Sequence, residues 1–524
     1  MDSARAPKLA TFPVELTAWI LGYLLPEGSV VDDWDAEEYA INPAFISSRR
    51  NLSNLCLTCR PLYDLATPYL YQAVVVKNQK ELFCLFRTLY EAPKLRDLIT
   101  CFAWCGMLHE VTPDEHRKVR SAYYSAPGPS SQADHHFRPR LPLTACSAFE
   151  GILAFMPKVK RLYTRISPTP MNEAGRETQL FPSEWMAFQR VLSALPSDGE
   201  EEMVRIEMLC RRLALPDTLS FPLALRELET ITIHFPLYSP AARNRRIIPG
   251  RVLQFCPSLK TVQIKGEGLR SSRCLETGWP LVATSEASEL AVYGACAPQQ
   301  FITLGCTVFP ALTRLSIHIG RPRDEIRADR VDAMYNCLHF FRRSLDTLCI
   351  TTYPRKIMFT RVSRSFLKDV LPKMQALKSL TTNIRFLVDE QTKELNIPSL
   401  MPPTLEALHL VDDWSSTMRR RMPSFPRARA PPDPQTCLSY SERVDLLLGA
   451  FHRDHRNYLP SLKEFQFTSS PIELEVGTWE ATWDDVEPLK ARFRMLFAAD
   501  KVDFKFRSVD DWHREIDSSF GNIR

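Results

Sequence analysis

The residues of this chain that could do chemistry are its cysteines and histidines, and the most suggestive spacing among them is the C-x-x-C formed by Cys56 and Cys59. Two thiols at this spacing can hold zinc or exchange a disulfide. The sequence offers no second pair at metal-ligand spacing, and both cysteines fall on an amphipathic helical pattern. We therefore interpret the pair as part of a helix and predict no metal there.

The histidines give no stronger indication of chemistry. His135 and His136 are adjacent, but they lie in a Pro-, Ser- and Gly-rich stretch without a Cys or carboxylate at suitable ligand spacing,. The remaining candidates fall on separate predicted strands or on one predicted helix, where histidines are usually structural or simply exposed: His234, His318, His409, His452 and His455.

Phosphate-binding and hydrolase motifs are also missing. The sequence has no G-x-x-x-x-G-K-[ST], no G-x-G-x-x-G after a strand, no H-E-x-x-H and no G-x-S-x-G, and it has only 17 glycines,. We predict a protein that is not an enzyme and has no cofactor. A Cys–His pair brought together by folding stays open as an alternative, because such partners need only be close in space.

Composition narrows the class further. With 45% apolar and 24% charged residues the chain is ordinary for a globular protein, and a net charge of +5 over 524 residues does not indicate nucleic acid as a partner,. No apolar run approaches the length of a membrane span, and the N-terminus lacks an apolar signal core,. Because the 14 cysteines are scattered, many of them on apolar faces, we expect reduced thiols and a cytoplasmic or nuclear location, or both,.

Two arginine-rich clusters interrupt the chain, one at 243–246 and one in the Pro-rich stretch 418–434. Aromatic residues that could stack on bases are not interleaved with them. We interpret both as solvated connections; a contact for an acidic partner or a nuclear-import patch is the alternative for the second cluster.

An internal repeat predicts the fold. Segments of the type Leu-x-x-Leu-x-Leu recur between 156 and 469, with successive separations of 34, 53, 33, 32, 28 and 57 residues between their first leucines. A weak additional copy around Leu290 falls in the first long gap, and a helical pattern near 441–459 falls in the last. The anchor leucines are Leu225, Leu259, Leu312, Leu345, Leu377, Leu405 and Leu462.

A period near 30 with one strand and one helix per unit is typical of a leucine-rich-repeat solenoid, in which each unit completes its core only by stacking on the next. The predicted fold class is therefore α/β: parallel strands with helices on the outer face, after a short N-terminal helical module. Another α/β arrangement of parallel strands remains possible. The intervening helices are expected in patterns such as VDAMYNCLHFFRRS and VSRSFLKDVLPKM.

The stretch from 9 to 72 differs from the repeats. Pro13 fits the first turn of a helix, and leucines and isoleucines recur every four residues behind it,. An acidic insertion spans 26–48, and a second amphipathic pattern follows, which Pro61 should break before Thr67 and Pro68 start a third helix,. The sequence thus predicts three short helices.

This stretch resembles an F-box, the module by which substrate receptors of SCF ubiquitin ligases dock on their Skp-type adaptor. The resemblance rests on Pro-x-Glu-Leu followed by Ile-Leu, and on the later Cys59-Arg60 pair. It implies a non-catalytic substrate receptor whose partners are a Skp-type adaptor, the cullin ligase core and an unknown protein target held by the repeats, with no nucleic acid and no membrane. The adaptor-binding residues that it implies are Phe12, Pro13, Leu16, Ile20, Leu21, Leu24, Leu52, Leu55, Cys59, Leu62 and Leu65.

We therefore expect a flexible N-terminus at 1–8, an F-box-like module at 9–72, a degenerate leucine-rich-repeat domain at 73–508 and a C-terminal tail at 509–524. Loops are expected in the repeat domain near 107–142 and 413–438. The alternative is a repeat scaffold or adaptor without a ubiquitin role, whose N-terminal helices cap the solenoid.

Overall fold

The structure is a computed structural model, and the part of the chain that it describes consists of many ranges. They are 13–23, 31–33, 40–41, 43–106, 145–165, 225–235, 256, 258–266, 287–294, 309, 311–319, 335–336, 338–352, 367–387, 396–412, 440–469 and 487–508. Phe12, Leu24, the expected terminal segments 1–8 and 509–524, and the expected loops 107–142 and 413–438 lie outside these ranges.

The chain divides into two compact units, which we describe separately. The first consists of residues 1–268, 273–286 and 516–524, and the second consists of 269–272 and 287–515.

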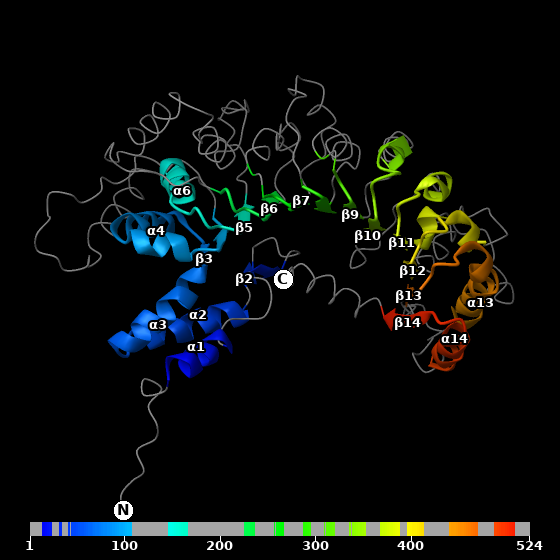
Figure 1. The fold of residues 1–524 in the computed structure, drawn as a ribbon, viewed down its shortest axis with the longest axis horizontal. Helices are drawn as coiled ribbons and strands as arrows, with labels where there is room; N and C mark the ends of the chain where they lie inside the picture. Colours follow the sequence, from blue (N-terminus) through cyan, green and yellow to red (C-terminus); the bar gives the residue numbers. More distant parts are fainter. Residues whose placement is uncertain are drawn as a thin grey trace, which may run out of the picture. The chain divides into compact units, whose positions relative to one another are not determined.

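Three helices open the first unit, as the sequence predicts (Figure 1). They are α1 (Val14–Tyr23), α2 (Pro43–Cys56) and α3 (Arg60–Gln72). Between the first two, the short strands β1 (Val31–Asp33) and β2 (Ala40–Ile41) pair antiparallel. Residues 43–48, expected in the acidic insertion, form the first part of α2.

The boundaries of the third helix were predicted wrongly. α3 begins at Arg60 with Pro61 in its first turn, where a missing N–H breaks no hydrogen bond, and it continues through Pro68,. Thr67 does not cap a helix start. Its hydroxyl instead donates to the Tyr63 carbonyl at 2.6 Å, one turn back inside the same helix,.

The three helices share a small apolar core. Leu21, Leu52 and Ala66 are buried at its centre, and the Tyr69 hydroxyl donates to the Ala18 carbonyl of α1 at 3.2 Å. Residues packed around this centre and partly buried are Leu55, Cys56, Leu65, Tyr69 and Leu70.

After α3 the first unit continues as a parallel sheet. Its strands β3 (Ala73–Val76), β4 (Cys101–Trp104), β5 (Arg161–Arg165), β6 (Thr230–Phe235) and β7 (Thr261–Gly266) neighbour one another in chain order. Helices α4 (Gln79–Glu91) and α6 (Ala145–Ala154) and the 3₁₀ turn η2 (Pro93–Leu98) connect them. Asn78 caps α4 by accepting from the Glu81 N–H at 3.0 Å,.

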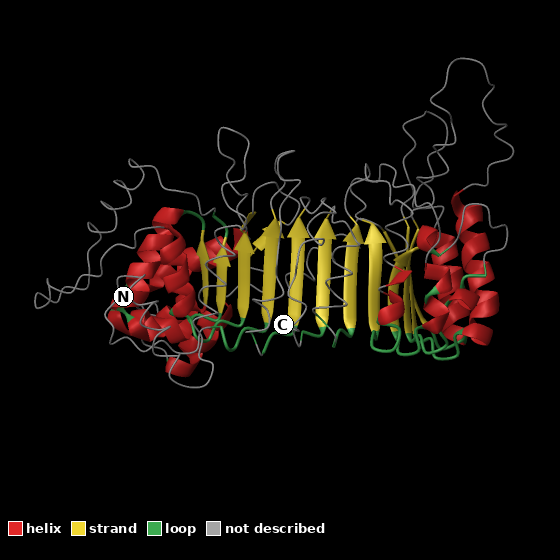
Figure 2. Ribbon diagram, turned by 90° about the horizontal axis from the view of Figure 1, so that it is seen from above, coloured by secondary structure: helices red, strands yellow, loops and turns green. Residues whose placement is uncertain are grey.

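The second unit repeats the same arrangement. Its strands are β8 (Glu289–Gly294), β9 (Arg314–Ile319), β10 (Thr347–Thr352), β11 (Ser379–Asn383), β12 (Ala407–Asp412), β13 (Glu464–Ser469) and β14 (Asp503–Ser508), again parallel and in chain order (Figure 2). Helices α13 (Tyr440–Tyr458) and α14 (Glu487–Ala499) precede its last two strands.

One predicted helix of this unit is not an α-helix in its described part, residues 367–374. In VSRSFLKDVLPKM the described residues form only two 3₁₀ turns, η7 (Leu367–Asp369) and η8 (Leu371–Lys373). Pro372 lacks the N–H that an α-helix would use at this point, so the segment closes tighter turns instead. Further 3₁₀ turns are η9 (Ile384–Phe386) and η10 (Pro398–Leu400).

A buried residue lies two positions before each strand from β4 to β13, and this residue sets the repeat register. Six of the seven anchor leucines occupy this position, and all seven are buried. Before β6 the residue at this position is Leu228, not the anchor Leu225, and before β8 it is Ala287. The weak copy around Leu290 is therefore a true strand of the pattern, as predicted.

In each unit, helices cover one face of the parallel strands, which we call the helix face. On the helix face of the first unit, Phe149 of α6 packs against Phe102 and Trp104 of β4, with ring centroids 6.2 and 5.8 Å apart. On that of the second unit, Phe451 of α13 stacks on Phe465 of β13 at 4.2 Å. The fold is thus α/β and repeat-like, with parallel strands, and is compatible with a solenoid.

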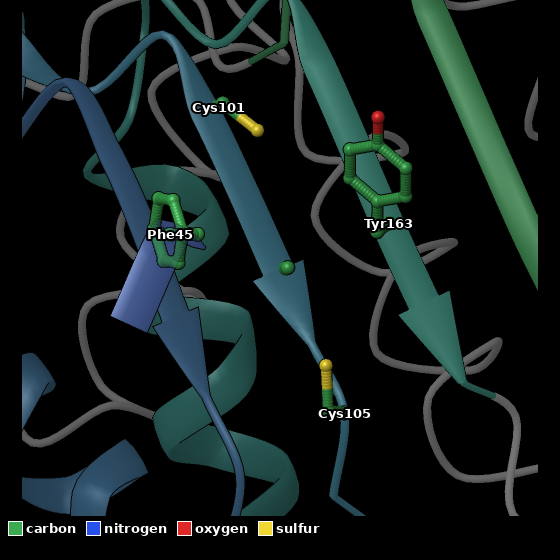
Figure 3. Packing of buried hydrophobic residues seen from close by; sticks show 5 residues of the cluster. Phe45, Cys101, Cys105 and Tyr163 are labelled. Atoms are coloured by element: carbon green, nitrogen blue, oxygen red, sulfur yellow. The ribbon is translucent and has the colours of Figure 1, made fainter. Parts of the chain in front are cut away.

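The N-terminal helices are fastened to the opposite face of the first strands. Phe45 of α2 is buried against Cys101, Cys105 and Tyr163 of the β4 and β5 region (Figure 3). Arg49, one turn further along α2, donates to the Leu70 carbonyl at 2.9 Å and also to the Ala73 carbonyl at the start of β3. The three helices and the first strands are therefore one packed body.

We predict that Phe45→Ala destabilises the first unit by about 3 kcal/mol, because it removes a buried ring and leaves a cavity over β4 and β5. Ile46→Ala is the matched control, since Ile46 is the next residue of α2 and is 46% exposed. Denaturant unfolding of both variants measures the difference. Equal stability of the two variants would contradict the packing of α2 on the strands.

Candidate functional site

Helix α1 is apolar on both of its sides. Of its ten residues, VELTAWILGY, only Glu15 is charged. The side that faces α3 buries Thr17 and Leu21. An amphipathic helix needs only one apolar side to join a core, so the second apolar side of α1 is not explained by the packing of the three helices.

The second side carries large exposed side chains. Leu16 is 51%, Trp19 64% and Tyr23 71% exposed, and Ile20 beside them is half-buried. Spacings of three, four and seven residues place these four on one helical face. The rings of Trp19 and Tyr23 meet edge to face with centroids 4.8 Å apart. We call Leu16, Trp19, Ile20 and Tyr23 the α1 patch; clustered exposed apolar side chains of this kind mark interaction sites.

The structure sorts the residues implied by the F-box resemblance into two groups. Pro13 and Leu16 are exposed, and Ile20 is half-buried, so these three can contact a partner. The residues that lie inside the helical module are the buried Leu21, Leu52 and Leu62 and the half-buried Leu55, Cys59 and Leu65, whereas Phe12 and Leu24 lie outside the described residues.

Sequence reasoning missed Trp19 and Tyr23. It followed the four-residue row of Leu16, Ile20 and Leu24, whereas the exposed face also uses the three- and seven-residue spacings from Leu16,. That signal was present in the sequence. Other large apolar side chains exposed in the same helices are Val14, Ile46, Leu57 and Tyr63.

No family model and no curated protein matches this chain. The functional assignment therefore depends on the α1 patch and on the chemistry of the described side chains. Among those side chains, no group of three or more His, Cys, Asp or Glu residues is arranged to hold a metal ion. Nor does the described part of the chain contain a helix of the length and apolar character that crossing a bilayer requires.

The C-x-x-C pair takes part in helix packing. Cys56 ends α2 and Cys59 precedes α3, and both are free thiols. The Cys56 sulfur lies 4.0 Å from the Thr67 hydroxyl oxygen of α3. The predicted helical position is therefore confirmed for Cys56 and wrong for Cys59, which lies between α2 and α3.

Folding does bring one Cys–His pair together on the face opposite the helices. His318 of β9 and Cys349 of β10 approach to 3.9 Å between Nε2 and Sγ, and the His318 Nδ1 lies 2.7 Å from the Thr351 hydroxyl. Burial raises the pKa of the Cys349 thiol to about 12 and lowers the pKa of His318 to about 3. Both groups are therefore neutral at pH 7, and the nucleophilic thiolate–imidazolium pair does not form.

A second polar cluster joins α13 to the turn after α14. The Nε2 atoms of His452 and His455 lie 3.1 and 3.2 Å from Oδ2 of the buried Asp500, and Arg456 pairs with its other oxygen. The guanidinium already neutralises this carboxylate. The cluster therefore fastens the last helices of the second unit together.

We predict that iodoacetamide at pH 8 alkylates Cys56 and Cys59 well before Cys349 in the native protein. With a pKa of about 12, only about one in ten thousand Cys349 side chains is a thiolate at that pH. Peptide mass spectrometry of timed samples measures the rates, and the guanidinium-unfolded chain serves as the control. Rapid alkylation of Cys349 would reinstate the Cys–His pair as a candidate catalytic site.

We predict that His318 makes the fold acid-sensitive. Its pKa of about 3 in the folded chain is below its unfolded value of about 6.5, so the unfolded state binds the extra proton first. The stability that His318 contributes is therefore complete above pH 6.5 and is lost by about 1.4 kcal/mol for each pH unit between 6.5 and 3.

Replacing His318 by Gln, which can still hydrogen-bond Thr351, should reduce this slope in urea unfolding between pH 7 and 5. An unchanged slope would show that the imidazole is not buried in the neutral form.

Proposed function

We propose that this chain is a non-catalytic substrate-recognition subunit of an SCF-type E3 ubiquitin ligase. Its N-terminal helices dock on a Skp-type adaptor in the manner of an F-box, and its parallel strands form a leucine-rich-repeat domain that holds a protein target. The observation that carries this proposal is the α1 patch, a row of exposed apolar side chains on a helix whose other side is already buried.

The two groups of residues have different roles in docking: the buried ones position the helices, and the exposed ones contact the adaptor. Leu21, Leu52 and Leu62 are buried and fix the positions of α1, α2 and α3. The exposed Leu16 then supplies an anchor that a groove of the adaptor can enclose, with Trp19 and Tyr23 on the same face. A few such anchors carry most of the binding energy of an interface, each typically contributing about 1 to 4 kcal/mol.

The repeat domain supports the second half of the proposal. Buried residues recur two positions before each strand from β4 to β13, and the strands pair parallel in chain order, as stacked leucine-rich repeats do,. Side chains of the face opposite the helices vary from strand to strand, which suits recognition of one protein surface. The packing of Phe45 and Arg49 on the first strands holds the docking helices to this domain.

We predict that Leu16→Asp abolishes co-purification with a Skp-type adaptor and leaves the fold intact. Position 16 is 51% exposed, so the introduced carboxylate stays in water in the free protein, whereas adaptor binding would bury it,. Leu446→Asp is the matched control, since Leu446 of α13 is 60% exposed on the second unit. Circular dichroism checks both folds. Retention of the adaptor by a folded Leu16→Asp protein would refute F-box docking.

A second candidate function is a repeat scaffold whose N-terminal helices act as a cap. It is favoured by the burial of Phe45 against β4 and β5. Deletion of 1–72 would remove Phe45 together with α1, so aggregation of the remainder supports a cap without excluding docking. The point variant Leu16→Asp separates the two functions, because a cap that uses only Phe45 and Arg49 does not need the α1 patch.

A further inference from the structure

The last strand, β14, presents an edge with which no other described strand pairs. The Asp503 N–H donates to the Lys463 carbonyl at 2.8 Å, which directs the main-chain groups of Asp503 and Lys505 toward β13. Main-chain groups alternate in direction along a strand, so those of Phe504 and Phe506 point to the other edge. That edge is a template for one more strand.

A groove runs along this edge. It has a volume of about 560 Å³ and is lined by α14, by the turn that follows it and by β14. In the repeats of this unit, such a space beside a strand is filled by the next strand and its helix. The groove therefore has the position of a repeat that the described chain does not supply. Its lining residues are Arg494, Ala498, Val502, Asp503, Phe504, Lys505, Phe506 and Arg507.

The charges of the groove indicate which kind of peptide can bind there. Arg494, Lys505 and Arg507 are cationic, and only Asp503 is acidic. Lys505 already pairs with Asp503 at 3.1 Å and with Glu464 at 2.7 Å. The exposed Arg494 stands on α14 at the other wall of the groove. The lining thus keeps a net positive charge beside the apolar side chains of Phe504 and Phe506.

We propose that this groove binds an extended peptide of a partner protein, in which acidic and β-branched residues alternate, as an additional strand on β14. Its main chain pairs with the free edge at Phe504 and Phe506. Its apolar side chains then continue the row of these two phenylalanines, and its acidic side chains lie on the face of Lys505. This binding is separate from adaptor docking and does not require it.

The test uses the full chain and a fluorescent synthetic peptide of roughly seven residues, the length that spans β14, in which Glu alternates with Val or Ile. Fluorescence anisotropy should show saturable binding. Two control peptides, one with Lys in place of every Glu and one with the same composition in blocks, should not bind. Equal binding of the three peptides, or no binding of the first, would overturn the proposal.

Arg507→Glu should weaken binding of the alternating peptide by about three- to tenfold, because Arg507 lines the groove on the same face of β14 as Lys505, where the acidic side chains lie,. Arg492→Glu is the control. Arg492 lies on α14, does not line the groove and forms an exposed ion pair with Asp445. Equal weakening by both variants would show that peptide binding depends only on the overall charge of the protein. Leu16→Asp should leave peptide binding unchanged.

Hydrogen exchange locates the bound strand. The Phe504 and Phe506 amides should exchange rapidly in the free chain and become protected when the peptide is added, whereas the Lys505 amide, which faces β13, should be slow in both states. Protection of the two phenylalanine amides without peptide would overturn the proposal. If that protection rises with protein concentration, a second copy of the chain covers the edge; if it does not, the chain covers the edge itself.

Discussion

The structure depends on one constraint: no single repeat of this chain can bury its own apolar residues. Each strand places alternate side chains on the helix face, and from β4 to β13 a further buried residue lies two positions before the strand,. Only the neighbouring strand and its leucine complete the enclosure. The buried residues Leu228, Leu259, Leu312, Leu345, Leu377, Leu405 and Leu462 form this row in every repeat where a leucine is present,.

The same constraint makes the two ends of a repeat array special, because each end leaves one side of a repeat without a neighbour. In the first unit, the opposite face of the first strands receives Phe45 and Arg49 from α2. In the second unit, β14 keeps an edge and a groove. An apolar surface at such a place is either covered by the chain or available to a partner; α2 covers the first strands, and no described strand pairs with the outer edge of β14.

Two clusters of chemistry-bearing side chains are held neutral or neutralised. Burial keeps His318 unprotonated and Cys349 protonated, although the two lie side by side. Asp500 is paired with Arg456 between two histidines. These groups therefore strengthen contacts between strands and helices. The surfaces that are open to a partner are instead apolar, as on α1, or a strand edge with cationic neighbours, as on β14.

The sequence by itself determined the repeat. The leucine spacing predicted parallel strands and most of their positions, including the weak copy at β8, because the pattern is local and recurs,. It also predicted three N-terminal helices, but it placed the start of α3 wrongly, since Pro61 and Pro68 are each compatible with a helix start or a helix interior until the neighbours of the helix are known,.

Only the tertiary structure decided which apolar residues are inside. Leu16 and Leu21 lie on the same short helix and look alike in the sequence, yet Leu16 is 51% exposed and Leu21 is 0% exposed. The difference arises because α3 packs against one side of α1. Likewise, His318 and Cys349 are 31 residues apart in the chain and meet only because parallel pairing of β9 with β10 aligns their strands.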